Sequence, residues 1–529
     1  MLVHELLDLG ANRRPDAPAL TYRQDTLSYA ASAELVRAAA RGYLALGVAR
    51  ADRVAIYLEK RLETAAAQFG AAASGAAFVP INPLLRARQV AYILKSCDVH
   101  VLVTTETRLD SLAEVLADCP ELRTVVVVDP TRTDTPAPGV ARISWPDFID
   151  GGRASARPAH RVIDADMAAI LFTSGSTGMP KGVVLSHGNL VASARSAATH
   201  IGNVAEDRLL CVLPFSFDYG IVQLTSAFHV GASVVLMNYL LPRDVPQAVV
   251  RERITGLAAV PPLWIPLADL DWPAGVSETL RYATNSGGAM PRATLDKLRR
   301  KLPRTGFHLM YGLTEAFRST ALPPPETERR PGSVGRPIPN AEVMVVRPDG
   351  TACRPGEPGE IVHRGAFVSK GYWRNKEATA ERFRPVPKPD PSLPLTELAV
   401  WSGDLGVFDE DGFLTYIGRR DEQIKTSGFR VSPTEVEDIV YSTHLVGEAV
   451  AFGVAHEVLG QAIVVVATPP PGGALDRAKL IEKCREVMPT YMVPHLVVER
   501  ATLPRTPNGK MDRPAISRDF VEAAKSAAQ

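Results

Sequence analysis

A short stretch rich in glycine and hydroxyl side chains is the part of this chain that most clearly suggests chemistry. It reads Thr173-Ser-Gly-Ser-Thr-Gly-Met-Pro-Lys181-Gly-Val and lies between two apolar runs. Glycine lets backbone N–H groups turn inward, and serine, threonine and lysine add donors to the same concavity. Charge-assisted hydrogen bonds from such a loop would hold a polyphosphate. We therefore expect phosphate contacts from Thr173, Ser174, Gly175, Ser176, Thr177, Gly178 and Lys181.

Two other glycine motifs do not describe this stretch. Lys181 is preceded by Pro180 and followed by Gly182, so the G-x-x-x-x-G-K-[ST] pattern of a P-loop is absent. No G-x-S-x-G occurs, which argues against the nucleophile turn of a hydrolase. The remaining alternative is a surface turn between two strands, but such turns rarely combine four hydroxyls with a lysine and apolar flanks.

Alternating helical and strand-like patterns must position this loop. They run through about the first 420 residues and predict α/β layers with largely parallel strands. From about residue 341, short strands and Gly/Pro turns predict a small β-barrel or distorted β subdomain. The pattern changes again near Asp421. We therefore predict a large N-terminal domain of residues 1–420 and a smaller α+β domain of residues 421–529.

Composition restricts the class of protein. The 46% hydrophobic and 22% charged residues are ordinary for a soluble globular chain, and the net charge of +1 gives no reason to expect nucleic acid. The 5 cysteines form no C-x-x-C pair, which favours a reducing compartment. No signal peptide is evident. Two uncharged stretches, Thr64–Leu85 and Tyr219–Pro242, are each predicted to be a buried helix and strand rather than a membrane span. We expect a cytoplasmic protein.

Four more motifs follow the loop at Thr173. They are Met310-Tyr-Gly-Leu-Thr-Glu315, Trp401-Ser-Gly-Asp404, Gly418-Arg-Arg-Asp421 and Pro507-Asn-Gly-Lys510. In this order and spacing the set resembles the adenylate-forming (ANL) superfamily, over about residues 5–515. The connecting segments look most like bacterial AMP-forming acyl-CoA ligases of the exosortase-associated type and stand-alone β-amino acid adenylating enzymes. The resemblance implies the ANL fold and a two-step reaction. A carboxylic acid and ATP give an acyl-adenylate, which a pantetheine thiol then attacks.

The resemblance also implies roles for individual residues. Lys510, Thr314 and Glu315 would be catalytic: Lys510 bridges the acid and the α-phosphate, Thr314 donates to that phosphate, and Glu315 holds Mg²⁺, which suits one carboxylate plus phosphate oxygens. Asp404 and Arg419 would bind the ribose. The remaining nucleotide contacts would be Ser286, Gly287, Gly288, Ala289, Tyr311 and Gly312.

The second step requires Lys510 to leave the cleft. By resemblance, Asp421 is the hinge that absorbs the backbone change as the C-terminal domain rotates. Gly428, in the turn after Thr426, would then line the thiol tunnel and leave room for a pantetheine arm.

The acid pocket is expected around Phe217, Asp218, Gly220 and Arg318. Fatty and aryl acyl-CoA synthetases often carry histidine where this chain has Phe217, so this position departs from their pattern. Asp218 aligns with the aspartate that binds the substrate ammonium in amino-acid-activating domains. A carboxylate in an apolar pocket requires a cation. The sequence leaves two partners open, a substrate amino group or Arg318, and Gly220 and Ser286 suggest a roomy floor.

Several functions keep these motifs. The leading hypothesis is an ATP-dependent, AMP-forming acid–thiol ligase that uses ATP, Mg²⁺ and CoA, most simply an acyl-CoA ligase. The alternative loads a β-amino or other amino acid onto the phosphopantetheine of a separate acyl carrier protein. A nucleotide sensor without turnover would be expected to lack Lys510 or Glu315, and both are present. A luciferase-like oxygenase would keep every motif but needs a special substrate.

Overall fold

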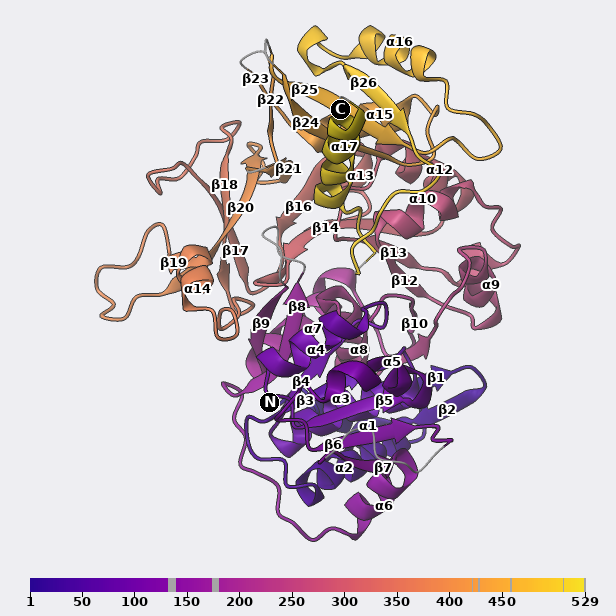
Figure 1. Cartoon of the computed structure of the whole chain (residues 1–529), viewed down its shortest axis with the longest axis vertical. Coiled ribbons are helices and arrows are strands. Elements are labelled where there is room, and N and C mark those ends of the chain that lie inside the picture. The colour runs from indigo at the N-terminus through magenta and orange to yellow at the C-terminus, as the bar shows by residue number, and fades with distance from the viewer. Residues whose placement is uncertain are drawn as a thin grey trace.

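The computed structural model describes residues 1–131, 139–173, 180–420, 422–426, 429–456, 459–507 and 509–527. Within these residues the chain forms three β-sheets, of seven, fourteen and five strands. The seven- and fourteen-stranded sheets belong to the large N-terminal part. The five-stranded sheet belongs to the C-terminal part, which lies across the upper end of the molecule in Figure 1.

The seven-stranded sheet carries the loop at Thr173 on its last hairpin. Its neighbouring strands are parallel except the final pair, which is antiparallel. In spatial order the strands are β7 (Ala141–Ser144), β6 (Thr124–Val128), β5 (Val101–Thr105), β3 (Arg53–Tyr57), β4 (Ala77–Pro80), β8 (Met167–Thr173) and β9 (Lys181–Ser186). Valine-rich strands such as β6 are buried throughout, as expected for a parallel sheet covered on both faces.

The fourteen-stranded sheet has a parallel half and an antiparallel half. The parallel half is β14 (Gly306–Leu313), β13 (Tyr282–Asn285), β12 (Gly256–Ala259), β10 (Arg208–Cys211), β11 (Ser233–Leu236) and β1 (Pro18–Tyr22), with β2 (Asp25–Ser28) antiparallel at the edge. The antiparallel half is β15 (Phe317–Leu322), β16 (Ser333–Pro337), β21 (Leu414–Arg419), β20 (Leu398–Phe408), β18 (Gly359–Gly365) and β17 (Ala341–Val346), with β19 (Phe383–Pro385) on β20.

Helices cover both faces of the seven-stranded sheet and of the parallel half of the fourteen-stranded sheet. One core joins the two sheets through α1 (Glu5–Arg13), α2 (Tyr29–Ala45), α3 (Leu62–Ser74), α6 (Trp145–Ala154), α7 (His187–Ile201) and α8 (Asp218–Val230). The outer face of the seven-stranded sheet packs on α4 (Ala87–Ser96) and α5 (Glu106–Leu116). The outer face of the other sheet packs on α9 (Asp244–Arg251), α10 (Pro261–Asp269), α11 (Val276–Thr279) and α12 (Arg292–Lys301). This is a five-layer α/β architecture.

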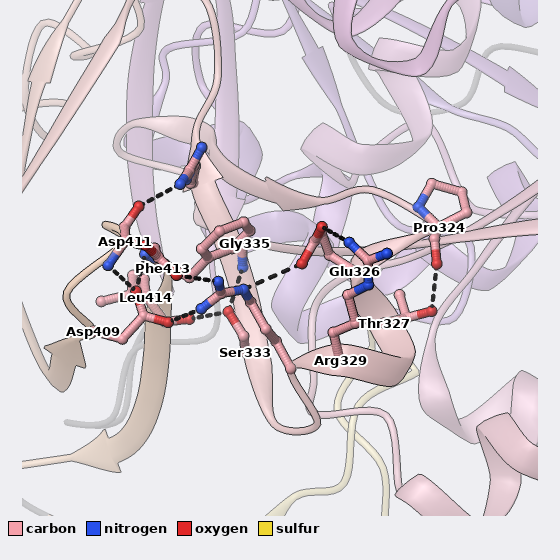
Figure 2. A network of polar contacts seen from close by, with 12 residues as sticks. Pro324, Glu326, Thr327, Arg329, Ser333, Gly335, Asp409, Asp411, Phe413 and Leu414 are labelled. Atoms are coloured by element: carbon pink, nitrogen blue, oxygen red, sulfur yellow. Dashed lines mark hydrogen bonds and ion pairs between the residues drawn. The ribbon is translucent and has the colours of Figure 1, made fainter.

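The strands predicted as a small barrel are an antiparallel extension of the large sheet, joined to it through β16 and β15. They project from the body of the molecule in Figure 1, together with α14 (Lys376–Arg382). A polar network fastens their base. Arg330 follows α13 (Glu326–Arg329) and pairs with Glu326, Asp409 and Asp411 while its guanidinium lies 4.0 Å from the Phe413 ring centroid. Figure 2 shows these carboxylates converging from both segments.

The C-terminal sheet begins five residues after β21, at β22 (Ile424–Thr426). Its other strands are β23 (Phe429–Val431), β24 (Ala449–His456), β25 (Gly460–Ala467) and β26 (Leu496–Glu499). One face packs on α15 (Pro433–Ser442) and α16 (Arg477–Val487), with the 3-10 turn Thr490–Met492, and the other packs on α17 (Arg513–Ala527). The predicted combination of a large α/β part and a smaller α+β part is confirmed. In the part of the chain that the structure describes, no helix is long and apolar enough to cross a membrane.

Candidate functional site

The predicted phosphate loop closes the β8–β9 hairpin. Thr173 and Lys181 are cross-strand partners, and the Thr173 hydroxyl donates to the Lys181 carbonyl at 3.4 Å. Ser174, Gly175, Ser176, Thr177 and Gly178 lie outside the described residues, as do Asp421 and Gly428. Lys181 Nζ lies 5.4 Å from the centroid of the Tyr372 ring, within cation–π distance. The hairpin therefore places Lys181 beside Tyr372, in the segment that follows β18.

Thr314 and Glu315 occupy the tight turn between β14 and β15. A Cβ on Gly312 would lie 2.0 Å from the Phe317 carbonyl oxygen, so this turn requires glycine. Phe317 is almost fully buried and has φ +52°, a left-handed conformation that is unusual for a bulky residue. The surrounding core holds this turn and fixes the direction of Glu315. Its Oε1 accepts a hydrogen bond of 2.5 Å from the Tyr372 hydroxyl.

A buried carboxylate lies beside an aromatic cluster on the neighbouring strands. Asp404 on β20 and Arg419 on β21 are cross-strand partners, and Asp404 Oδ1 lies 3.2 Å from Arg419 Nε. Asp404 Oδ2 accepts a hydrogen bond of 2.6 Å from the Tyr311 hydroxyl. The Tyr311 ring is 5.4 Å from the Tyr416 ring and 5.6 Å from that of His363, centroid to centroid. Burial raises the pKa of Asp404, and Arg419 and Tyr311 oppose that rise.

The segment after β13 faces the same space. Asn285 is buried, its Nδ2 donates to the Gly288 carbonyl at 3.1 Å, and its Oδ1 accepts no hydrogen bond. Gly287 has φ +78°, and a Cβ there would lie 3.1 Å from Lys510 Cε. Ala289 continues the turn. Small residues in this turn therefore allow the chain to pass close to Lys510.

Lys510 reaches this space from the far end of the sequence. Its loop is closed by a 2.7 Å hydrogen bond from Thr506 N to the Lys510 carbonyl, and Asn82 Nδ2 donates to the Pro507 carbonyl at 2.5 Å. Lys510 Nζ lies 5.3 Å from the Phe217 ring centroid. Burial lowers the pKa of Lys510, while the carboxylates of Asp218, Asp404 and Glu315 raise it. Carboxylates from three separate elements thus favour the protonated form of Lys510.

A cavity joins the predicted acid pocket to Lys510. Its space not filled by atoms is about 390 Å³, part of it open to solvent. The lining residues are Phe217, Asp218, Tyr219, Val222, Ser286, Gly287, Gly312, Leu313, Thr314, Phe317, Arg318 and Lys510. The structure therefore brings predicted residues from four motifs to one cavity.

Asp218 and Arg318 line this cavity without forming an ion pair. Asp218 Oδ1 is buried and accepts no hydrogen bond, and burial raises the pKa of Asp218. The Arg318 guanidinium lies 5.2 Å from the Tyr219 ring centroid, and its Nη1 is 3.4 Å from His200 Nε2. Burial lowers the pKa of His200 to about 3, so this ring is neutral and can accept. The internal partner considered for Asp218 is therefore engaged elsewhere.

Gly220 packs closely against the backbone that precedes it. A Cβ on this residue would lie 2.1 Å from the Pro214 carbonyl oxygen. Gly220 is needed because the first turn of α8 packs on the backbone before it, and the residue does not line the cavity. Ser286 does line it.

The comparison with protein families covers most of the chain. Residues 7–373 match the family of AMP-binding enzymes, and residues 435–510 match the AMP-binding enzyme C-terminal domain. The chain belongs to the AMP-binding enzyme family.

Relatives of this AMP-binding enzyme differ in size and in the acid they use. It is 32% identical to an L-proline–[L-prolyl-carrier protein] ligase of Streptomyces coelicolor, covering 92% of this chain and 91% of that protein. It is 30% identical to an indoleacetate–CoA ligase of Aromatoleum aromaticum, covering 97% and 96%. The chain spans only 6% of the length of a linear gramicidin synthase polypeptide of Brevibacillus parabrevis, to which it is 29% identical over 98% of its own length.

A solved structure confirms the fold. The anthranilate CoA ligase AuaEII, in complex with anthranoyl-AMP, superposes with a TM-score of 0.87 at 23% identity, covering 100% of this chain and 98% of that one. The predicted ANL membership and fold are confirmed.

Sequence reasoning missed the residues that support the motif side chains. Tyr372 contacts both Glu315 and Lys181, and His363 and Tyr416 flank Tyr311. No motif surrounds these residues. Strand pairing brings them to the site: an isolated β-bridge joins Val183 of β9 to Tyr372. Sequence alone offers no signal for such a pairing.

Proposed function

We propose that this enzyme activates a carboxylic acid with ATP and transfers the acyl group to the thiol of CoA. The observation that carries the proposal is the position of Lys510. This lysine enters the same cavity as Asp218, Ser286 and Thr314, which lie about two hundred or more residues earlier. The charges of Asp218, Asp404 and Glu315 favour its protonated form by raising its pKa. Such a convergence suits a site that brings two anions together.

In the first step the acid's carboxylate oxygen attacks the α-phosphorus, and pyrophosphate leaves with the bonding electron pair. Lys510 would bridge the carboxylate and the α-phosphate, with Thr314 donating to the same phosphate. Lys181 and its loop would hold the departing pyrophosphate. Each cation or donor offsets the repulsion between two anions, which is the main barrier to this reaction.

The buried polar groups fit a nucleotide. The Asn285 Oδ1 atom lacks a hydrogen-bond donor and could accept one from the amino group of adenine. We assign the adenine slot to the Ser286–Ala289 turn and the Tyr311 ring, with Gly312 allowing the close turn behind them. Asp404 and Arg419 would bind the ribose hydroxyls. The 2.6 Å hydrogen bond from the Tyr311 hydroxyl would orient the Asp404 carboxylate for this role.

A metal ion would depend on the nucleotide itself. In the described ranges no group of three or more His, Cys, Asp or Glu side chains could hold one. One carboxylate combined with phosphate oxygens fits Mg²⁺, and Glu315 is the candidate ligand. When bound, Mg²⁺ would neutralise charge on the phosphates.

The second step requires a thiol in place of Lys510. Sulfur attacks the acyl carbon, AMP leaves, and a proton is released. We propose that residues 421–529 form a mobile domain hinged at Asp421, and that Gly428 lines the thiol path after rotation. The short link between β21 and β22 supports this boundary. We also propose a cytoplasmic location, since all 5 cysteines are free thiols.

One observation favours a second candidate, in which an amino acid is loaded onto the phosphopantetheine of a separate carrier protein. Asp218 Oδ1 is buried without a hydrogen bond, and no residue in the described ranges forms an ion pair with this carboxylate. Among the nearby groups, Lys510 lowers the pKa of Asp218 most, and in the proposed cycle it departs. A substrate ammonium would supply a permanent partner.

The test is ATP–pyrophosphate exchange with a panel of fatty, aryl, α-amino and β-amino acids. We expect at least one acid to support exchange, and AMP release should then follow with CoA. A pantetheinylated carrier protein offered in parallel separates the two candidates. Both candidates would be refuted if none of the acids offered supported pyrophosphate exchange by the purified enzyme and AMP was never released.

A further inference from the structure

A second polar cavity lies outside the site described above. It occupies the carboxyl ends of β3 and β4 and the segment after β10, beside α3, whose label lies next to those of β3 and β4 in Figure 1. The space not filled by atoms is about 290 Å³, part of it open to solvent. The lining residues are Ile56, Leu58, Lys60, Thr64, Gln68, Pro80, Ile81, Pro83, Pro214, Phe215, Ser216 and Asn238. Ligands of α/β proteins commonly bind at such strand ends.

The cavity contains one buried cation. Lys60 is 8% exposed, and its ammonium makes a single hydrogen bond, of 3.1 Å, to the Val212 carbonyl. Within the described residues no carboxylate oxygen lies within 4.0 Å of it. Its backbone is clasped by Asn238, which accepts from Lys60 N at 3.2 Å and donates to the Lys60 carbonyl at 2.8 Å. An ammonium has three donors, so two are unused.

Neutral donors without partners surround this cation. Ser216 is 7% exposed, and its hydroxyl oxygen is buried with no hydrogen bond. Gln68 on α3 is 1% exposed, and its amide group forms no hydrogen bond with any described residue. Polar groups without a hydrogen-bond partner are costly at this depth, so their arrangement along one space suits a polar ligand.

The charge of the cavity is not balanced from within. Burial lowers the pKa of Lys60 to about 8, while Cys211 and Glu59 raise it. Burial raises the pKa of the Cys211 thiol to about 12, so this group is neutral. Glu59 is paired with Arg108. At neutral pH Lys60 is therefore mainly protonated and lacks a counter-charge of its own.

The chemistry of the walls selects the ligand. One lysine balances one negative charge, and a carboxylate accepts several hydrogen bonds from an ammonium, a hydroxyl and an amide. A phosphate dianion would leave a charge uncompensated. Leu58, Ile81 and Phe215 provide an apolar wall that would pack on a short hydrocarbon tail.

We propose that this cavity is a second carboxylate site, which binds a short-chain monocarboxylate through Lys60, Gln68 and Ser216. It is separate from the acid pocket but connected to it along the chain. Ser216 lines one cavity, while Phe217 and Asp218 line the other. Occupation at Lys60 would therefore restrain the residues that hold the acid to be activated, and the level of free acid would modulate the enzyme.

Localisation is the first experiment. Crystals of the full chain are soaked with 3-bromopropionate, and the bromine is located from its anomalous signal. A peak between Leu58, Ile81 and Phe215 with the carboxylate at Lys60 supports the proposal. Bromine only in the cavity of Lys510, or in neither cavity, overturns it.

Affinity in solution is the second experiment. Propionate is titrated at constant ionic strength, set with chloride, into wild type, Lys60→Met, Ser216→Ala and the exposed control Lys95→Met. We expect Lys60→Met to weaken binding at least about tenfold, Ser216→Ala about threefold and Lys95→Met not at all. Ser216→Ala retains the lysine and guards against a folding defect in Lys60→Met. Equal binding by all four proteins would refute the assignment, as would chloride or inorganic phosphate competing as well as propionate does.

Discussion

Asp218→Asn is the substitution that separates the two candidate acids. In the folded protein one oxygen of this carboxylate is buried without a donor, and burial raises its pKa. If a substrate ammonium is the natural partner, the variant loses one charge-assisted hydrogen bond inside the cavity. Such bonds contribute about 1.5–3 kcal/mol, which corresponds to a loss of roughly 10–150-fold in kcat/KM.

The assay compares matched acids that differ only in the amino group, such as 3-aminobutyrate and butyrate, in ATP–pyrophosphate exchange. We expect the amino acid to lose the full factor, while its partner stays within about twofold because it never contacts the lost charge. An equal loss with both acids would refute ammonium recognition and show that Asp218 acts on the enzyme itself.

The same variant gives a check by thermal unfolding. A carboxyl whose folded pKa is raised stabilises the protein only below its unfolded pKa, and this contribution is lost as pH rises through the folded pKa. Asp218→Asn removes the penalty of the buried charge. Its Tm relative to wild type should therefore increase, in the absence of ligand, as pH rises from about 4, the ordinary pKa of an aspartate, to the raised pKa of Asp218. A difference in Tm that does not change with pH would mean that Asp218 is not desolvated.

Three further predictions concern the cavity around Lys510. Lys510→Ala should slow adenylate formation by about 10²–10³-fold while thiolation of supplied acyl-adenylate is largely spared; equal loss in both half-reactions would contradict the proposed role. Gly287→Ala introduces a Cβ 3.1 Å from Lys510 Cε at a residue with φ +78°. We expect the free energy of unfolding to fall by about 1–3 kcal/mol, which lowers Tm, and adenylation to become slower. Unchanged adenylation would show that Lys510 does not need the space that Gly287 leaves beside its side chain. Tyr311→Phe removes the 2.6 Å bond to Asp404 and should raise KM for ATP about tenfold with little change in KM for the acid.

Local pattern and motif order anticipated much of this molecule. The buried helix and strand predicted for Thr64–Leu85 match α3 and β4, because apolar residues and the left-handed Gly75 between them are local signals. The motifs at Glu315, Asp404 and Lys510 can be found from sequence because each is a short stretch of distinctive composition, although Asp404 lies within strand β20 rather than in a turn.

Non-local contacts could not be anticipated in the same way. Tyr372 reaches Glu315 only because β9 and the segment after β18 form a bridge, and local sequence does not encode that pairing. The role of Gly220 could not be read from sequence for a related reason. A missing side chain leaves room for substrate in one fold and for the Pro214 carbonyl in another, and only three-dimensional packing decides between them.

The pairing of Asp404 with Arg419 has a consequence for timing. Arg419 is the last residue of β21, and the next strand, in the other domain, begins at Ile424. Arg419, the side chain proposed to bind the ribose, therefore lies two residues before the proposed hinge at Asp421. A departing nucleotide would release Arg419 next to the residue about which the C-terminal domain is proposed to rotate. The order of product release and of the return of Lys510 would then depend on the Asp404–Arg419 ion pair.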